Sequence, residues 1–152
     1  MTRTVCGVVF FVDEHEKVLV FGGVGQDAIA AAWPEIAAEY DGWAAIFKFR
    51  DVMAPVVFLN EIGAWVAEDF VVMGLLPKDF IDVAENGHGP DDVRGKAARM
   101  AKFAGESFAK DPDAMPELFV LRDDYLEMGA ALHVGFLKIG YCIIYEAKII
   151  NK

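Results

Sequence analysis

Two apolar segments near the start of the sequence, only four residues apart, limit the fold more than any other feature. Residues 5–12 and 17–21 are rich in valine and phenylalanine, and the polar stretch 13–16 separates them. Parallel strands need a crossover of about a dozen or more residues, so strands this close form an antiparallel hairpin. We therefore expect a mainly antiparallel sheet that opens with an N-terminal hairpin.

Three segments carry apolar residues at the spacing of an α-helix, near residues 26–40, 91–110 and 123–133. Pro34 lies inside the first segment. Either the helix kinks at this proline, or a second helix begins with Pro34 at its first position. The sequence thus predicts about three helices.

Further strands are expected at residues 43–49, 54–60 and 137–149, while residues 64–74 fit either a strand or a helix. In the 137–149 segment the odd positions are apolar, which is typical of a half-buried strand. Together these elements predict a single α+β domain over residues 1–152, with the helices packed on one face of the sheet.

The balance of charge excludes several classes of partner. The chain has 14 Lys and Arg against 24 Asp and Glu, which gives a formal net charge of −10. Nucleic acids and anionic membrane surfaces repel such a chain on average. We recognise no secretory leader and no membrane-spanning segment in the sequence. We therefore expect a cytoplasmic protein that binds neither nucleic acid nor membrane.

The two cysteines, Cys6 and Cys142, both lie in apolar segments. Free thiols in such segments are usually buried, and the Cys-x-x-Cys spacing of metal and redox sites does not occur. We expect buried free thiols, and we expect neither a bound metal nor a cofactor.

The chain is unusually apolar. Apolar residues make up 55% of it, and counting the 14 glycines as well raises the share above the usual ~45–50%. A surplus of this kind is typical of a buried subunit interface. We therefore expect a homo-oligomer.

A glycine motif follows the second apolar segment. The sequence from Gly23 through Gly25 to Ala28 fits the pattern G-x-G-x-x-A of loops that wrap a phosphate. Against this function, the preceding strand is expected to be one arm of a hairpin, and Asp27 places a negative charge in the first helical turn. Asp51 follows too late to be the acid that such a site requires. We expect Gly23 and Gly25 to form a turn, with Asp27 as a helix cap.

The strongest candidate for a ligand site is the glycine-rich segment 85–92 together with the basic helix at 94–110. His88 in the loop could act as a general base, and Arg94 and Arg99 on the helix could bind an anion. Lone loop histidines and charged helix faces are also commonly just solvated. We treat His88, Arg94 and Arg99 as candidate ligand-binding residues.

Three functions remain open from the sequence. We expect a small non-catalytic binding or regulatory protein that works as a homo-oligomer, because no convincing nucleophile, metal cluster or cofactor motif is present. The alternative is an enzyme or small-anion-binding protein with its site at residues 85–92 and 94–110. A third hypothesis is an acidic inhibitor or immunity-type protein that covers a basic surface of another macromolecule.

Overall fold

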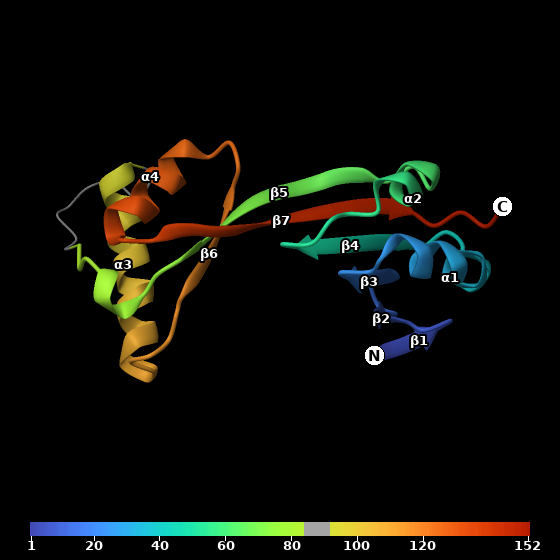
Figure 1. Ribbon diagram of the computed structural model, residues 1–152, viewed down its shortest axis with the longest axis horizontal. Coiled ribbons are helices and arrows are strands. Elements are labelled where there is room, and N and C mark those ends of the chain that lie inside the picture. The colour runs from blue at the N-terminus through green and yellow to red at the C-terminus, as the bar shows by residue number, and fades with distance from the viewer. Residues whose placement is uncertain (84–91) are drawn as a thin grey trace. The chain divides into compact units, whose positions relative to one another are not determined.

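The computed structural model describes residues 1–83 and 92–152. Within these ranges the chain forms seven strands, four α-helices and one short 3₁₀ helix, η1 (Figure 1). The elements are, in chain order, β1 (Thr2–Val5), β2 (Val8–Asp13), β3 (Val18–Gly22), α1 (Gln26–Glu39), β4 (Ala44–Arg50), α2 (Val56–Glu61), β5 (Trp65–Gly74), η1 (Pro77–Asp79), α3 (Val93–Lys110), β6 (Glu117–Leu121), α4 (Tyr125–Val134) and β7 (Leu137–Lys148). The strands are hydrogen-bonded in the order β1-β2-β3-β4-β7-β5-β6. The α+β class predicted from the sequence is confirmed.

The described chain divides into two compact units. Unit 1 comprises Met1–Asp69 together with Cys142–Lys152, and unit 2 comprises Phe70–Tyr141. The prediction that the whole chain forms one domain stays a prediction.

The sheet of unit 1 combines antiparallel pairs with one parallel pair. Strand β2 pairs antiparallel with both β1 and β3, and β3 then pairs in parallel with β4. Helix α1 connects β3 to β4 and so provides the crossover that a parallel pair requires. Strand β4 pairs antiparallel with β7, from Arg50 opposite Cys142 to Ala44 opposite Lys148.

The core of unit 1 is a layer of aromatic rings between the sheet and helices α1 and α2. Phe10, Phe21 and Phe47 lie in one row across three neighbouring strands. The rings of Phe21 and Phe47 stack with their centroids 4.9 Å apart. Trp33 of α1 meets Phe58 of α2 edge to face at 5.3 Å, and both rings contact this row. Both helices therefore cover the same face of the sheet.

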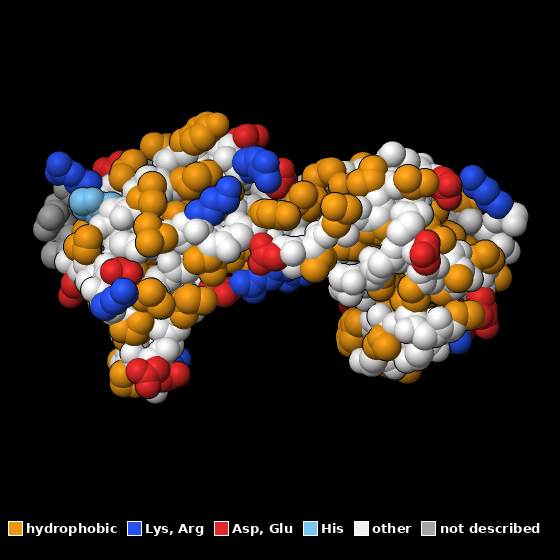
Figure 2. All heavy atoms as spheres, viewed as in Figure 1, with side chains coloured by type: hydrophobic (Ala, Val, Ile, Leu, Met, Phe, Trp, Pro, Cys, Tyr) orange, Lys and Arg blue, Asp and Glu red, His pale blue; other side chains and the backbone are white. Residues whose placement is uncertain are grey.

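The opposite face of this sheet is covered by neither α1 nor α2. Side chains alternate along a strand, so Val9 and Phe11 of β2 point away from the core and are 55% and 48% exposed. Val20 and Ile46 share a row with Phe11 and are half-buried. Figure 2 shows hydrophobic side chains at many places on the surface in view.

Unit 2 packs helices α3 and α4 together with strands β5 and β6. The strands are antiparallel, from Phe70 opposite Leu121 to Gly74 opposite Glu117. The predicted helices at 91–110 and 123–133 both form. Small and apolar side chains of the two helices build most of the core of unit 2, namely Ala97, Met100, Ala101, Ala104, Ala130, Ala131 and Val134.

The prediction of a strand at residues 54–60 is wrong, because this segment contains helix α2. Pro55 is the N-cap residue of this helix. Phe58 and Leu59 are buried, whereas the two valines before them are exposed. Burial of these two side chains outweighs the preference of valine for strands. Residues 64–74, which fitted either state, lie mostly in strand β5.

A tight turn interrupts the first predicted strand, residues 5–12: β2 begins only at Val8, and Thr2–Val5 form a separate strand, β1, most of which lies before the predicted segment. Cys6 and Gly7 both have positive φ angles, 49° and 81°, as a two-residue hairpin turn of type I′ requires. Cys6 is consequently exposed, so the expectation of a buried thiol is wrong for this residue. Cys142 is buried as predicted.

Three smaller differences complete the comparison with the sequence. Helix α1 continues through Pro34 as one helix, and residues 117–121 form a strand that the sequence did not predict. The odd positions of β7 are exposed at Leu137, Ile139 and Tyr141, although the later odd positions are half-buried or buried.

In the described parts of the chain, no helix is long and apolar enough to span a membrane.

Candidate functional site

Of the predicted ligand site, the structure describes the basic helix at residues 94–110 but not the loop before it. His88 and residues 85–91 lie outside the described residues. Arg94 and Arg99 are both exposed on α3, and each interacts with another group of the protein. The site can therefore be built from α3 and the elements of unit 2 that surround it.

Unit 2 has a groove of about 280 Å³ beside α3. Helix α3 contributes two cationic and two apolar residues, β6 contributes one apolar residue, and α4 contributes one acidic residue. These are Lys96, Arg99, Met100, Phe103, Leu118 and Glu127. The groove thus joins positive charge to an apolar wall, which suits a ligand that has an anionic group and a small apolar part.

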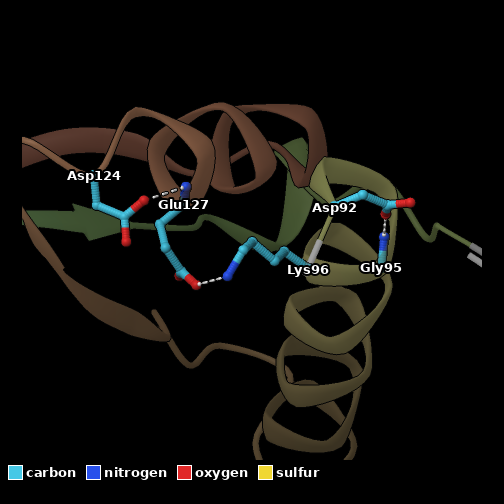
Figure 3. A network of polar contacts seen from close by, with 5 residues as sticks. All are labelled: Asp92, Gly95, Lys96, Asp124 and Glu127. Carbon is cyan, nitrogen blue, oxygen red and sulfur yellow. Dashed lines mark hydrogen bonds and ion pairs between the residues drawn. The ribbon is translucent and has the colours of Figure 1, made fainter. Parts of the chain in front are cut away.

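An ion pair fixes the position of Lys96 in this groove. Its Nζ lies 2.9 Å from Oε1 of Glu127, and the side chains of Lys96 and Glu127 are 17% and 31% exposed (Figure 3). Because both groups are partly shielded from water, their attraction is stronger than that of a fully exposed pair. The pair also joins α3 to α4, 31 residues apart in the sequence.

Aspartate caps set where the two helices of this site begin. The backbone N–H of Gly95 donates to Oδ1 of Asp92 at 2.7 Å, and that of Glu127 donates to Oδ1 of Asp124 at 3.1 Å (Figure 3). Each cap satisfies one N–H of the first turn, which has no partner within its own helix. The N-cap of α3 is therefore Asp92, and that of α4 is Asp124.

Helix α3 is basic in an acidic protein. It carries five basic residues, Arg94, Lys96, Arg99, Lys102 and Lys110, against one acidic residue, Glu106. Positive charge concentrated on one element attracts anions locally even where the whole chain is negative. Of the five, Lys96 and Arg99 line the groove.

The glycine motif lies between two parallel strands, so one argument against a phosphate site was wrong. Strand β3 is an arm of a hairpin and also the first strand of a β-α-β unit. The N–H of Gly23 donates to the carbonyl of Lys48 at 3.0 Å, and Gly23 has a φ of 62°. Gly25 is the N-cap of α1, and Asp27 lies in the first turn without a capping hydrogen bond, contrary to its expected role. The glycines therefore form the turn into α1.

The exposed thiol of Cys6 has a carboxylate partner. Its Sγ donates to Oε2 of Glu35 at 3.1 Å. This hydrogen bond, followed by desolvation, raises the pKa of Cys6, because both favour the neutral thiol over the thiolate. Nearby, the Arg3 guanidinium donates to Glu39 and Tyr40 and joins β1 to α1, and these bonds raise the pKa of Arg3.

Sequence reasoning missed the partners of the basic helix. Leu118 of β6 and Glu127 of α4 line the groove, yet no local motif marks either of them, because they meet α3 only after β6 and α4 have packed on it. Within the parts of the chain that the structure describes, no group of three or more His, Cys, Asp and Glu residues is arranged to hold a metal ion. Unit 1 contains a larger cavity, which the sequence did not indicate.

Comparison with known proteins assigns no family to the chain. No known protein family and no curated protein sequence matches it. Among solved structures, the chain matches a GCN5-related N-acetyltransferase from Kribbella flavida, with 11% sequence identity and a TM-score of 0.49. The match covers 97% of this chain and 89% of that one.

The matched protein is named as an enzyme, and this finding contradicts our expectation of a non-catalytic binding or regulatory protein. A likeness of this degree does not transfer an activity to the chain, so the α3 groove has to support a function by its own geometry. The predicted self-association and cytoplasmic location stay predictions.

Proposed function

We propose that the α3 groove of unit 2 binds a small anionic ligand. The observation that carries the proposal is that Lys96 and Arg99 line the same groove as the apolar residues Met100, Phe103 and Leu118. A guanidinium binds phosphate or carboxylate with two parallel hydrogen bonds, whereas an ammonium acts as a point charge. Arg99 and Lys96 together can supply both kinds of contact.

The volume of the groove limits the size of the ligand that it can hold. Sites that enclose a drug-sized molecule measure about 300–1,000 Å³, and this groove, at about 280 Å³, lies just below that range. We therefore expect it to hold the anionic group of a ligand, such as a phosphate or diphosphate, together with a short apolar portion.

Glu127 has a positioning role in this proposal. Its carboxylate holds Nζ of Lys96 at 2.9 Å, which reduces the conformational freedom that Lys96 would otherwise lose when a ligand binds. It also neutralises one of the two groove cations. Arg99, which itself already interacts with another group of the protein, supplies the contact of two parallel hydrogen bonds to an anion.

A thermal-shift experiment with phosphate, diphosphate and adenosine nucleotides tests the proposal. A ligand present at about 100 times its Kd stabilises the folded state by about 2.7 kcal/mol, which raises the Tm of a chain of this length by about 5–10 °C. Arg99→Ala should remove most of the shift, and Arg99→Lys should retain part of it. Lys110→Ala, on the same helix but outside the groove, is the matched control and should change nothing.

Two results would contradict the proposal. One is that none of the phosphate compounds raises the Tm of the wild-type chain. The other is a shift that survives Arg99→Ala unchanged, because the anion would then bind elsewhere.

A further inference from the structure

Unit 1 contains a cavity of about 470 Å³ between α1, the end of α2 and the C-terminal segment after β7. Its volume lies within the ~300–1,000 Å³ range of small-molecule sites. Trp33 and Ala37 of α1 and Ile62 after α2 supply apolar lining. Unlike the α3 groove, this cavity is made entirely of unit 1 residues, so it is a separate site.

Hydrogen bonds hold two walls of the cavity in place. The N–H of Phe58 donates to the side-chain oxygen of Gln26 at 3.2 Å, which ties the start of α2 to α1. The N–H of Ile149 donates to the carbonyl of Trp43, and the N–H of Asn151 donates to Oδ1 of Asp41, both at 2.8 Å. Because these contacts are made between groups of the protein itself, little of the binding free energy would be lost in ordering the walls.

The lining joins an aromatic surface to a cation. Trp33 packs against Phe58 and Phe47, with centroids 5.3 and 6.0 Å away, so its ring is held firmly at the cavity. Among the residues that the structure describes, no hydrogen bond or ion pair uses the ammonium of Lys148 or the side-chain amide of Asn60. Both groups line the cavity and can interact with a ligand.

The charged side chains that line the cavity indicate whether it favours an anionic or a cationic ligand. Lys148 and Lys152 line the cavity against one acidic residue, Glu61. Among the side chains of the lining, positive charges exceed negative ones by one, although the whole chain has a formal net charge of −10. An anion is therefore favoured here over a cation.

We propose that this cavity binds a small apolar molecule that carries one carboxylate. Its ring or hydrocarbon part packs against Trp33 and Ala37, and its carboxylate pairs with Lys148 and accepts a hydrogen bond from the amide of Asn60. The proposal is independent of the α3 groove, and either site can exist without the other.

Three probes of nearly equal shape test the charge preference: 2-naphthaleneacetate, 2-naphthaleneacetamide and 2-(2-naphthyl)ethylamine. Isothermal titration calorimetry gives their affinities, and ¹H–¹⁵N spectra locate them through the amide resonances of Asn60, Gly63 and Asn151. We expect the carboxylate to bind one per chain with a Kd near ~1 mM, as is usual for the number of atoms in the probe. The amide should bind more weakly, and the amine most weakly.

Charge reversal at the cavity tests the role of Lys148. Lys148→Glu should weaken binding of 2-naphthaleneacetate about 3–10-fold, the range expected when an attractive exposed pair becomes repulsive. Lys148→Arg should retain binding. Lys102→Glu, in unit 2, changes the net charge equally and is the matched control, with the wild-type affinity expected.

Three results would overturn the proposal. The first is that no cavity resonance moves at about 10 mM probe, roughly ten times the expected Kd. The second is that the amine binds as well as the carboxylate. The third is that Lys102→Glu weakens binding as much as Lys148→Glu, because the overall charge would then be the cause. Failure of phosphate to bind at the α3 groove has no bearing on these outcomes.

Discussion

Substitution of Gly135 by alanine should be among the most damaging single changes in unit 2. Gly135 ends helix α4 with a φ of 108°, a conformation that a residue with a side chain rarely adopts. An added Cβ would lie far inside contact distance of the carbonyl oxygen of Asp79. It would also lie 3.0 Å from that carbonyl carbon and 3.2 Å from Cδ1 of Leu75. The obstacle is mainly backbone, which cannot rotate away.

The expected loss is the sum of two effects. A strained backbone conformation costs about 1–3 kcal/mol, and overpacking against atoms that cannot move costs about 1–3 kcal/mol more. We therefore expect Gly135→Ala to lower the free energy of unfolding by about 2–6 kcal/mol, a large part of the roughly 5–15 kcal/mol of an ordinary domain. At about 2–4 °C for each kcal/mol, the Tm should fall by about 4–24 °C.

Two other glycines separate these effects. Gly63 has a φ of 72° but open space where a Cβ would stand, so Gly63→Ala tests strain alone. Gly129 lies inside α4 with neither strain nor a close neighbour, so Gly129→Ala should stabilise the protein by up to about 1 kcal/mol. Urea unfolding followed by circular dichroism measures all three. The reasoning fails if Gly135→Ala loses no more stability than Gly63→Ala, because the contact with Asp79 would then have no energetic weight.

Three further predictions concern polar contacts. Asp124→Ala should cost about 1 kcal/mol in urea unfolding through loss of the α4 cap, and Asp124→Asn should cost little; equal losses would contradict a capping role. A double-mutant cycle with Lys96→Met and Glu127→Gln should give a coupling of about 0.5–1 kcal/mol that shrinks as salt is added, whereas zero coupling at low salt would show that the pair has no energetic weight. Glu35→Ala should lower the raised pKa of Cys6, so the pH–rate profile of iodoacetamide alkylation should move to lower pH; an unchanged profile would exclude Glu35 as the cause.

The sequence predicts elements well where apolar spacing is long and regular. Helix α3 shows this most clearly, because Ala97, Met100 and Ala104, which follow one another at the helical spacing of three and four residues, are buried. Short segments carry too few repeats for their spacing to decide. Six residues form α2 and five form β6, so packing of Phe58 in one case and pairing with β5 in the other determined their state.

The parallel pairing of β3 with β4 escaped prediction for a different reason. Strand β3 is close enough in sequence to β2 to form a hairpin, and that local relation says nothing about its other edge. The second partner depends on where α1 returns the chain. The candidate site could be predicted only in part for the same reason. Lys96 can be recognised in the sequence as part of a basic helix, but its partner Glu127 becomes its neighbour only when α4 packs on α3.

Unit 1 is completed late in synthesis, and this leaves one edge of its sheet unpaired in the nascent chain. Its first 69 residues leave the ribosome early, but the strand that pairs with β4 arrives only with residues 142–148. Until then the nascent chain presents the hydrogen-bonding edge of β4 beside the rings of Phe47 and Phe49, and such an edge invites pairing with other chains. Truncation just before residue 142 should therefore yield an insoluble product during expression, even though most of unit 1 would be present.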